Sequence, residues 1–240
     1  MDDPELSIVL PCFNESASIP GLLERFAAVA SAIRLELVLV DNGSTDDSGR
    51  KLARELAKPA YRFARCVSAP VNRGYGGGIQ EGLKSCRAEA VGFSHADLQC
   101  PPEDVLAAYR LYQKNSTAGP VLVKGSRTGR SGGDALISGC YNRLSSFVLG
   151  YDLGDVNGQP KIFPQSFVSA VHTGPNDLAL DLHVVHQAAR RGMRIVEFDV
   201  RFEERRHGQS KWAHNRLSKA RTILQALGRL LQMRLAGNRR

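Results

Sequence analysis

The stretch that decides the fold is AVGFSHADLQCPPED, residues 90–104. Its first four residues are apolar, which is typical of a buried strand, and the Pro101-Pro102 pair can begin a helix. Between them, His95, Asp97 and Gln99 alternate along the chain. Alternate side chains of an extended backbone point to one side, so we predict that the three converge at a strand's carboxyl end, where open α/β sheets bind ligands. They would hold a divalent cation there; the alternative is a polar strand exit that only caps the next helix.

Strand and helix patterns alternate on both sides of this stretch. Apolar runs at 6–10, 35–40 and 63–68 precede it, each followed by apolar residues at helical spacing. The run at 35–40 is apolar almost throughout, as in a parallel sheet covered on both faces. We therefore predict an α/β fold whose first half binds a nucleotide. Beyond it we expect a strand at 121–123, a polar loop at 125–133, a helix at 136–149, a tight turn at 155–160, a helix at about 176–191 and a strand at 193–202.

The composition restricts the class of protein. The 240 residues carry 32 Lys and Arg against 24 acidic residues, a net charge of +8 that suits phosphate-bearing partners. Five scattered cysteines without a CxxC pair argue against a disulfide framework or zinc site and for a reducing compartment. The acidic start lacks a signal peptide, and no apolar run approaches the roughly 20 residues that span a bilayer. We expect a protein that is soluble or lies on a membrane without crossing it.

Polar side chains also follow the first two strands. Asp41 ends the second run, where a carboxylate can accept a hydrogen bond from a ribose hydroxyl or a base N–H. Capping of the next helix is served better by Ser44 or Asp46, which favours a ligand role for Asp41. Asn14-Glu15 after the first strand is a similar case in which capping is an equally good interpretation.

The glycine-rich segment at 72–78 follows the third strand. A dinucleotide fingerprint needs G-x-G-x-x-G after the first strand, so a Rossmann dehydrogenase is disfavoured. Gly74 and Gly76 instead permit the close approach of a ligand to the backbone at a helix N-terminus, beside Arg73.

A set of cations follows the first half of the chain. Taken singly, each is most often a solvated surface charge. Together with the glycine-containing segment 206–211, they predict an anion site for a second substrate. The set is Arg127, Lys161, Arg205 and Lys211.

Six short motifs occur in the order in which a known family carries them. They are Pro11-Cys12-Phe13-Asn14-Glu15, Val40-Asp41-Asn42-Gly43-Ser44, Asn72 to Gly76, His95-Ala96-Asp97-Leu98-Gln99 before Pro101-Pro102-Glu103, Gly125-Ser126-Arg127, and Arg205 with Gly208-x-Ser210-Lys211. On these motifs, over residues 6–213, the chain resembles the family 2 glycosyltransferases of GT-A fold, particularly the dolichyl- or polyprenyl-phosphate sugar synthases. Two positions depart from the family pattern, because His95 and Asn42 stand where the family has Asp.

The resemblance implies a role for each matching residue. It implies one GT-A domain at 1–212, with a nucleotide-sugar half at 1–118 and an acceptor half at 119–212. It implies Mg²⁺ or Mn²⁺ held by His95, Asp97 and Gln99; imidazole favours Mn²⁺ over the harder Mg²⁺. The implied nucleotide-sugar contacts are Pro11, Asn14, Glu15, Asp41, Gly43, Asn72, Arg73, Gly74, Gly76, Ala96 and Asp97. The implied catalytic residues are Asp97, Arg127, Lys161, Arg205 and Lys211.

The family chemistry is inverting transfer of a sugar from a GDP-mannose or UDP-glucose type of donor to a polyprenyl phosphate. An ionised phosphate acceptor needs no general base, whereas a sugar hydroxyl would need a carboxylate, for which Asp177 and Asp181 are the candidates. Two alternatives stay open: a soluble family 2 glycosyltransferase with a carbohydrate or other hydroxyl acceptor, and a catalytically silent protein that binds nucleotide sugars.

Residues 213–240 form a basic amphipathic pattern, with an apolar stripe interleaved with five Lys or Arg. Such a helix can lie in an anionic membrane interface, or it can pack on the domain or pair subunits. We expect a cytoplasmic protein with peripheral contact at the inner membrane face, a possible oligomer, and no nucleic-acid partner. The stripe is Leu217, Ala220, Leu224, Leu227, Leu231 and Leu235.

Overall fold

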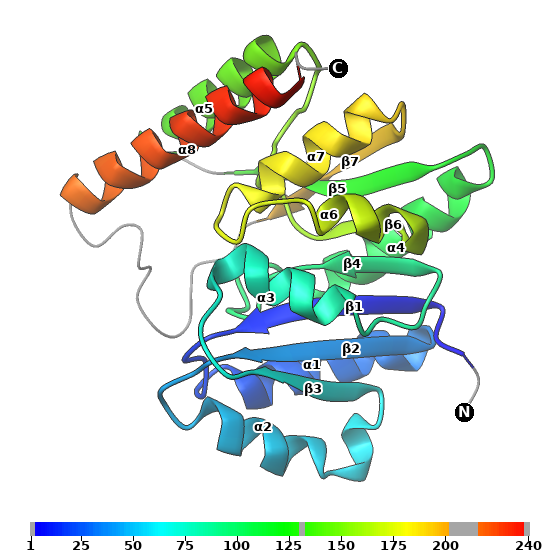
Figure 1. The fold of residues 1–240 in the computed structure, drawn as a ribbon. Helices are drawn as coiled ribbons and strands as arrows, with labels where there is room; N and C mark the ends of the chain where they lie inside the picture. Colours follow the sequence, from blue (N-terminus) through cyan, green and yellow to red (C-terminus); the bar gives the residue numbers. More distant parts are fainter. Residues whose placement is uncertain (1–2, 130–132, 202–215, 238–240) are drawn as a thin grey trace.

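The strands of the computed structural model, which describes residues 3–129, 133–201 and 216–237, form one seven-stranded sheet with the order β3-β2-β1-β4-β6-β5-β7 (Figure 1). The strands are β1 Leu6–Cys12, β2 Leu35–Asn42, β3 Ala64–Ala69, β4 Ala90–Phe93, β5 Val121–Thr128, β6 Lys161–Pro164 and β7 Arg194–Arg201. The helices are α1 Ile19–Ala32, α2 Ser48–Leu56, α3 Gly74–Leu83, α4 Pro102–Ser116, α5 Gly133–Leu149, α6 Val168–Val171, α7 Leu180–Arg190 and α8 Arg216–Gly237, with 3-10 turns at Pro59–Tyr61 and Gln165–Phe167.

One strand runs against the others. β1, β2, β3 and β4 pair in parallel, and so do β5 and β7, whereas β6 is antiparallel to both β4 and β5. The first residue of β6, Lys161, therefore lies opposite Phe93, the last residue of β4. The turn that leads into β6 thus reaches the same sheet edge as the exits of β1, β2 and β4.

Apolar side chains cover both faces of the sheet. On one face, Phe93 and Phe163 pack with residues of α3, α6 and α7. On the other face, Ile8 and Leu37 pack with residues of α1, α2 and α4. The α/β fold predicted from the alternation, with a parallel first half buried on both sides, is confirmed.

Two predicted boundaries are wrong. β5 extends to Thr128, so the predicted polar loop at 125–133 is strand over 125–128. The polar residues Gly125 to Thr128 are strand because they pair in register with Phe198 to Arg201 of β7. The predicted helix at 176–191 begins only at Leu180, because residues 174–177 form a loop held against α3.

α5 and α8 lie side by side along one outer edge of the molecule (Figure 1). Leu230 and Met233 of α8 pack against the core, whereas Leu224, Leu231 and Leu235 of the predicted apolar stripe are exposed. No helix in the described ranges is long and apolar enough to cross a bilayer.

Candidate functional site

Asn14 joins the loops that follow β1 and β2. It has a positive φ of 59°, and its Oδ1 accepts hydrogen bonds from the backbone N–H groups of Thr45 and Asp46 at 2.8 and 3.3 Å. Its own N–H donates to Ser44 Oγ at 3.2 Å. Glu15 accepts from Ser18 Oγ at 3.1 Å just before α1, but the N-cap residue Ser18 makes no side-chain capping hydrogen bond to the helix. The loops of two implied nucleotide-sugar motifs are therefore tied together at one edge of the sheet.

Asp41 lies at the end of β2 beside the start of α2. Its Oδ1 accepts from the N–H of Ser44 at 3.0 Å, so the prediction that local capping leaves Asp41 free is wrong. Asp46 accepts from the N–H of Ser48 at 2.9 Å, as the capping interpretation predicts. Gly43 has a φ of 68°, and a Cβ there would meet the Val71 backbone at 2.5 Å. The second motif is thus packed closely against the segment that enters α3.

Asn42 has a structural role that an acid could not fill. The side chain is 2% exposed, its Nδ2 donates to the Gly74 carbonyl at 2.9 Å, and its Oδ1 accepts from the Arg73 N–H at 3.1 Å. Asn72 Oδ1 accepts from the Gly74 N–H at 2.7 Å, so both amides shape the start of α3. A carboxylate at position 42 could accept from Arg73 but could not donate to Gly74.

The glycines of α3 are approached closely by another part of the chain. A Cβ on Gly74 would lie 2.5 Å from the Asn176 carbonyl oxygen, and one on Gly76 would lie 2.4 Å from that of Pro175. The Gly77 N–H donates to the Asn176 carbonyl at 3.1 Å. At these three glycines, the predicted close approach to the backbone is therefore made by the 174–177 loop and not by a ligand. Pro11 contacts the same helix through Gly78, and the Arg73 side chain is half-exposed beside Glu81.

The chain turns sharply after β4, and this overturns the prediction that three alternate side chains share one face. The strand ends at Phe93, Leu98 has a φ of 61°, and residues 96–100 form a bend. Asp97 Oδ1 accepts from the N–H of Gln99 at 3.1 Å, which closes the turn. Ala96 is 4% exposed and packs in the core. His95 and Asp97 remain at the predicted sheet edge, but a turn rather than extended backbone sets their orientation.

His95 lies among charged groups of both signs. Its ring is 5.5 Å from that of Tyr75, centroid to centroid. Burial lowers the pKa of His95, the charges of Asp97 and Asp181 oppose the shift, and those of Lys161 and Arg127 reinforce it. The predicted metal motif and two predicted cations therefore meet around this imidazole, which the lowered pKa keeps neutral near pH 7.

Lys161 is buried in an ion pair, not exposed as a free phosphate-binding cation. Its Nζ is 2.5 Å from Asp181 Oδ1 and donates to the Gly158 carbonyl at 2.8 Å. Gln159 Nε2 donates to Asp181 Oδ1 at 2.8 Å and to the Tyr75 hydroxyl at 3.0 Å. Burial, with the charge of Asp181, raises the pKa of Tyr75 well above its ordinary value. Asp181, a candidate base in the sequence, is 3% exposed and is held in this buried network.

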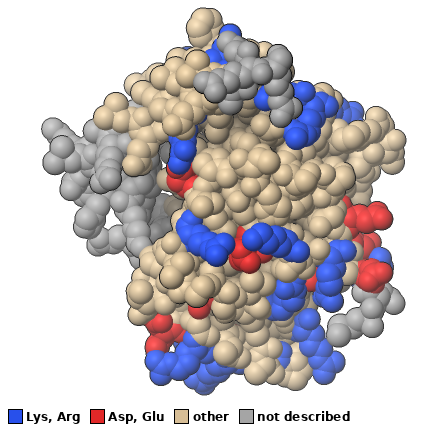
Figure 2. Space-filling view, viewed as in Figure 1, with Lys and Arg blue, Asp and Glu red and all other residues tan. Residues whose placement is uncertain are grey.

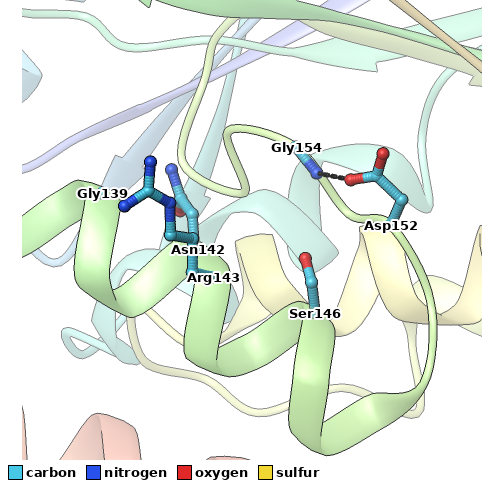
Figure 3. A pocket seen from close by; sticks show the side chains of 6 residues that line it. All are labelled: Gly139, Asn142, Arg143, Ser146, Asp152 and Gly154. Atoms are coloured by element: carbon cyan, nitrogen blue, oxygen red, sulfur yellow. Dashed lines mark hydrogen bonds between the residues drawn. The ribbon is translucent and has the colours of Figure 1, made fainter.

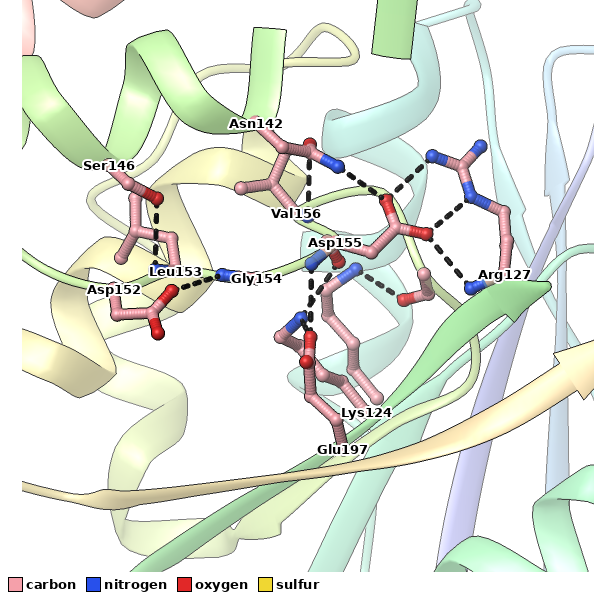
Figure 4. Close-up of polar contacts among 12 residues, drawn as sticks. Lys124, Arg127, Asn142, Ser146, Asp152, Leu153, Gly154, Asp155, Val156 and Glu197 are labelled. Atoms are coloured by element: carbon pink, nitrogen blue, oxygen red, sulfur yellow. Dashed lines mark hydrogen bonds and ion pairs between the residues drawn. The ribbon is translucent and has the colours of Figure 1, made fainter. Parts of the chain in front are cut away.

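Arg127 forms a bidentate ion pair with Asp155 (Figure 4). The Nε–Oδ2 and Nη2–Oδ1 distances are 2.8 and 2.7 Å, and the Arg127 N–H donates to the same carboxylate at 3.0 Å. Burial alone would raise the pKa of Asp155, but the hydrogen bonds and charge of Arg127 outweigh it and hold the pKa well below its usual range. Arg127 therefore orients the 154–160 turn.

Lys124 is a functional candidate that the sequence reasoning missed. It is fully buried, donates to the Asp155 carbonyl at 2.8 Å and pairs with Glu197 of β7 (Figure 4). Burial lowers the pKa of Lys124, and Glu197 partly offsets this. The sequence signal for Lys124 is its place directly after the apolar run Val121–Val123, which predicts that the lysine is buried. A buried lysine needs an anionic or hydrogen-bonding partner. Together the two lysines and Arg127 hold the turn that enters β6.

The remaining predicted charges lie farther along the chain. Asp177 is half-exposed and pairs with Arg229 of α8, with an Nη2–Oδ2 distance of 3.0 Å. It precedes α7, so it does not share a helix face with Asp181. Arg205 and Lys211 lie outside the described residues.

A groove of about 390 Å³ opens between α5 and the chain that follows it (Figure 3). Asn142 and Arg143 of α5 line it, together with Asp152 and Gly154. The Asn142 amide also contacts Asp155 Oδ1 at 3.3 Å, so the groove lies directly beside the Arg127–Asp155 pair. Figure 2 shows basic and acidic side chains of the described residues interspersed over the face that it displays.

The potential metal ligands at the sheet edge, His95 and Asp97, fit a divalent cation that the substrate also coordinates. Within the described ranges, no three His, Cys, Asp or Glu side chains converge as a site built from protein alone. His95 and Asp97 provide an imidazole and a carboxylate, and Mg²⁺-type sites commonly combine one or two carboxylates with substrate phosphates and water.

Solved structures identify the class of fold. Glucosyl-3-phosphoglycerate synthase from Mycobacterium tuberculosis, in complex with Mn²⁺, UDP and phosphoglyceric acid, aligns with a TM-score of 0.70 at 18% identity, over 96% of this chain and 78% of that chain. The same enzyme with Mn²⁺ and UDP-glucose also gives a TM-score of 0.70, at 18% identity over 95% of this chain and 79% of that chain. The predicted GT-A fold is thereby confirmed.

The family follows from the sequence comparison. The model of glycosyl transferase family 2 matches residues 7–171, and the chain belongs to this family. Dodecaprenyl-phosphate galacturonate synthase of Rhizobium johnstonii is 30% identical over 239 residues, covering 96% of this chain and 68% of the relative. Undecaprenyl-phosphate 4-deoxy-4-formamido-L-arabinose transferase of Pseudomonas fluorescens is 30% identical over 220 residues, covering 88% of this chain and 61% of the relative. The chain thus spans about two thirds of the length of these curated relatives.

Proposed function

We propose that this protein transfers a sugar, with inversion at the anomeric carbon, from a nucleoside diphosphate sugar to a polyprenyl phosphate. Family membership and the two curated relatives, both named for polyprenyl-phosphate acceptors, support the reaction class. The nucleotide-sugar half at 1–118 would carry the donor, and the acceptor half at 119–212 would carry the lipid phosphate.

The pairing of Asp181 with Lys161 is the observation that carries the choice of acceptor. A hydroxyl acceptor needs a carboxylate that can take its proton, and both sequence candidates have cationic partners. Asp181 is buried against Lys161 at 2.5 Å, and Asp177 pairs with Arg229 at 3.0 Å. A phosphate monoester has a second pKa near 6, is largely ionised at neutral pH and needs no such base. The geometry therefore favours the phosphate acceptor over the hydroxyl alternative.

The donor would lie across the exits of β1, β2 and β4. Asn14, Asp41 and the start of α3 line this edge, and Asp97 lies at its β4 end. The loops are held by their own hydrogen bonds, so the donor would meet a preorganised edge. The solved structures of the same fold contain UDP and UDP-glucose, which favours a UDP-linked over a GDP-linked donor.

Asp97 and His95 are the residues that would hold the divalent metal, with Gln99 beside them in the turn. A metal there supplies charge neutralisation for the leaving diphosphate. The neutral imidazole of His95 favours Mn²⁺ over Mg²⁺, since nitrogen ligands suit the softer ion better. The neighbouring fold contains Mn²⁺ with UDP, in line with this choice.

The acceptor phosphate would meet the cationic side chains of the second half. The guanidinium of Arg127 is oriented by Asp155, which the groove residue Asn142 also contacts. Lys161 would act through the buried network that positions the 154–160 turn instead of touching the phosphate. Arg205 and Lys211, which follow the family's Arg-x-x-Gly-x-Ser-Lys pattern, stay proposed phosphate contacts. The exposed leucines of α8 would contact the membrane that holds the lipid acceptor.

A two-part experiment tests the proposal. Calorimetry with UDP- and GDP-sugars, with and without Mn²⁺, identifies the donor, and a transfer assay with undecaprenyl phosphate in detergent identifies the acceptor. We expect Asp97→Asn to lower transfer by at least about a hundredfold, because the turn keeps its acceptor oxygen but loses its charge. Lys84→Met, at an exposed ion pair far from the edge, is the matched control. Binding without transfer to any acceptor would favour the silent binding protein, and transfer only to hydroxyl acceptors would favour the soluble alternative.

A further inference from the structure

The orientation of the His95 ring depends on one aromatic contact. Its centroid lies 5.5 Å from that of Tyr75, and the two ring planes are inclined by 35°. Among the described residues, none forms a hydrogen bond with a ring nitrogen of His95. His183 on α7 differs, because its Nε2 lies 2.9 Å from the Ala170 carbonyl oxygen. The χ2 angle of histidine has broad preferences, so packing against Tyr75 sets the orientation of the His95 ring.

Tyr75 is in turn held from two sides. It follows Gly74 at the start of α3, its ring packs against the core cluster on this face of the sheet, and its hydroxyl accepts from Gln159 Nε2 at 3.0 Å. The neighbouring glycines admit the 174–177 loop, in which the Asn176 carbonyl accepts from the Gly77 N–H at 3.1 Å. The ring and the backbone of Tyr75 therefore have little freedom to move.

Gln159 links Tyr75 to the buried ion pair. It is 1% exposed, and the same Nε2 donates to Asp181 Oδ1 at 2.8 Å. A reversed amide would place Oε1 against the carboxylate, acceptor against acceptor, so only one orientation of the amide is favourable. Within the described ranges Oε1 is buried without a partner, a cost that the two Nε2 hydrogen bonds must outweigh. A chain of contacts thus runs from the ion pair, through Gln159 and Tyr75, to His95.

The two rings form the open end of this chain. Tyr75 and His95 are both partly exposed, whereas Gln159 and Asp181 are buried. His95 also stands two residues before Asp97, the carboxylate of the same sheet edge. A histidine that ligates a metal is usually oriented by a hydrogen bond from its second ring nitrogen. For His95, among the described groups, the ring of Tyr75 takes the place of that hydrogen bond.

We infer that Tyr75 is a positioning residue whose ring fixes the His95 imidazole as a ligand for the divalent metal. The inference deepens the proposed function and rests on it, because it takes His95 as one of the metal-binding residues. It also gives the Lys161–Asp181 pair an indirect part in metal binding, through the hydroxyl of Tyr75.

Calorimetric titration of Mn²⁺ into the full chain with saturating UDP, without sugar or acceptor, tests this inference. We expect Tyr75→Leu to weaken Mn²⁺ binding about tenfold, the lower end of the effect of losing an orienting partner. Tyr75→Phe keeps the ring and should weaken binding by less than about threefold. Tyr61→Leu is the matched control and should leave Mn²⁺ binding unchanged, since that ring lies 6.2 Å from the ring of Phe63 on the other face of the sheet.

A double-mutant cycle separates positioning from general damage to the site. His95→Ala removes the ligand, so Tyr75→Leu should change Mn²⁺ binding by less than about twofold in that background. Losses that multiply in the double variant would overturn the inference, because Tyr75 would then act on the site by another route. If Tyr75→Leu lowers the thermal midpoint, Tyr75→Met, which fills more of the space, replaces it in the same cycle.

Pulsed electron paramagnetic resonance of bound Mn²⁺ gives a readout that a purely structural role would not change. The coupling of Mn²⁺ to an imidazole nitrogen should be present in the wild type and Tyr75→Phe, weaker in Tyr75→Leu and absent in His95→Ala. Unchanged coupling and affinity in Tyr75→Leu would refute the inference and leave the proposed metal site intact. If His95→Ala itself binds Mn²⁺ as the wild type does, the proposed role of His95 fails together with the inference. None of these measurements requires sugar transfer, which separates them from the test of the reaction.

Discussion

Lys161 on β6 and Asp181 on α7 form an ion pair with an Nζ–Oδ1 distance of 2.5 Å, and both side chains are almost completely buried. The pair connects the turn that enters the antiparallel strand with the helix that covers it. Gly158 and Gln159 complete its hydrogen bonds. Because Lys161 lies directly opposite the last residue of β4, the pair supports the sheet edge and is not a solvent-facing charge.

Removal of either partner should therefore lower the free energy of unfolding, and should affect sugar transfer only indirectly. We expect Lys161→Met to lower the free energy of unfolding by about 3–5 kcal/mol, because Asp181 is left charged and buried. The double variant Lys161→Met/Asp181→Leu should recover most of this loss. Urea unfolding monitored by circular dichroism measures both, and Lys84→Met at an exposed pair should change stability by less than about 1 kcal/mol. A stable Lys161→Met protein with transfer abolished would instead make Lys161 a phosphate-binding residue.

Asn42 stands where the family has Asp, and mutation can test the structural role of its amide. Asn42→Asp restores the family residue but loses the donor to the Gly74 carbonyl and adds a buried charge. We expect a loss of about 1–3 kcal/mol in the free energy of unfolding. Asn115→Asp, at a half-buried amide that donates to the Leu111 carbonyl at 2.8 Å, should cost less. Equal stability of Asn42→Asp and wild type would show that the amide donor is dispensable.

Two glycines on helices should respond to alanine with opposite signs. Gly76→Ala places a methyl group 2.4 Å from the Pro175 carbonyl oxygen, so the 174–177 loop must move away from α3. We expect it to lower the free energy of unfolding by about 1–3 kcal/mol. Gly228→Ala on α8 meets no atom within 4 Å and should raise it by about 0.5–1 kcal/mol. Thermal melts of the two variants decide this, and the same sign for both would refute the packing argument.

His186 predicts a pH dependence of stability. It is buried on α7 against the ring of Tyr151, and burial lowers its pKa to about 4, from the ordinary value of 6.5. Between these two values the unfolded chain binds a proton that the folded chain does not, so stability falls as pH drops from 6.5 to 4 and this contribution levels off below 4. The expected loss is on the order of 3 kcal/mol.

His186→Leu isolates this contribution, since leucine fills similar space and does not titrate. The difference in unfolding free energy between wild type and His186→Leu should change in favour of the variant as the pH is lowered from 7 to 4. Parallel pH profiles for the two proteins would mean that His186 is protonated equally in the folded and unfolded chains.

The metal motif gives a prediction about selectivity. We expect UDP binding to be strengthened more by Mn²⁺ than by Mg²⁺ in the wild type, because of the imidazole of His95. His95→Asp should narrow this difference, since a second carboxylate suits Mg²⁺. Calorimetric titration of UDP in each metal measures the ratio without any need for turnover. An unchanged ratio would place His95 outside the metal's ligands.

Strand and helix alternation made the fold class predictable, whereas single charges did not reveal their environments. The strand at 35–40 was recognisable because nearly every side chain is apolar, but Gly125 to Thr128 became strand only through pairing with β7, which is distant in sequence. Lysine is ordinarily exposed, so nothing local distinguished Lys161 from a surface cation. His95, Asp97 and Gln99 do alternate in the sequence. Leu98 has a positive φ, however, so the backbone is not extended there and alternate side chains need not share one face. Motif order indicated the family, but which partner neutralises which charge required tertiary structure.

The antiparallel direction of β6 makes the turn before it structurally independent of the parallel strand-helix units. A parallel strand at this place would begin at the far rim of the sheet and would need a long crossover to return. Because β6 instead begins beside the end of β4, a short turn delivers residues 154–160 to the rim where the parallel strands finish. Changes in that turn can therefore alter the side of the sheet edge that we propose for the acceptor without altering the strand-helix units that we propose for the donor. One inverted strand thus separates the two proposed substrate sites structurally.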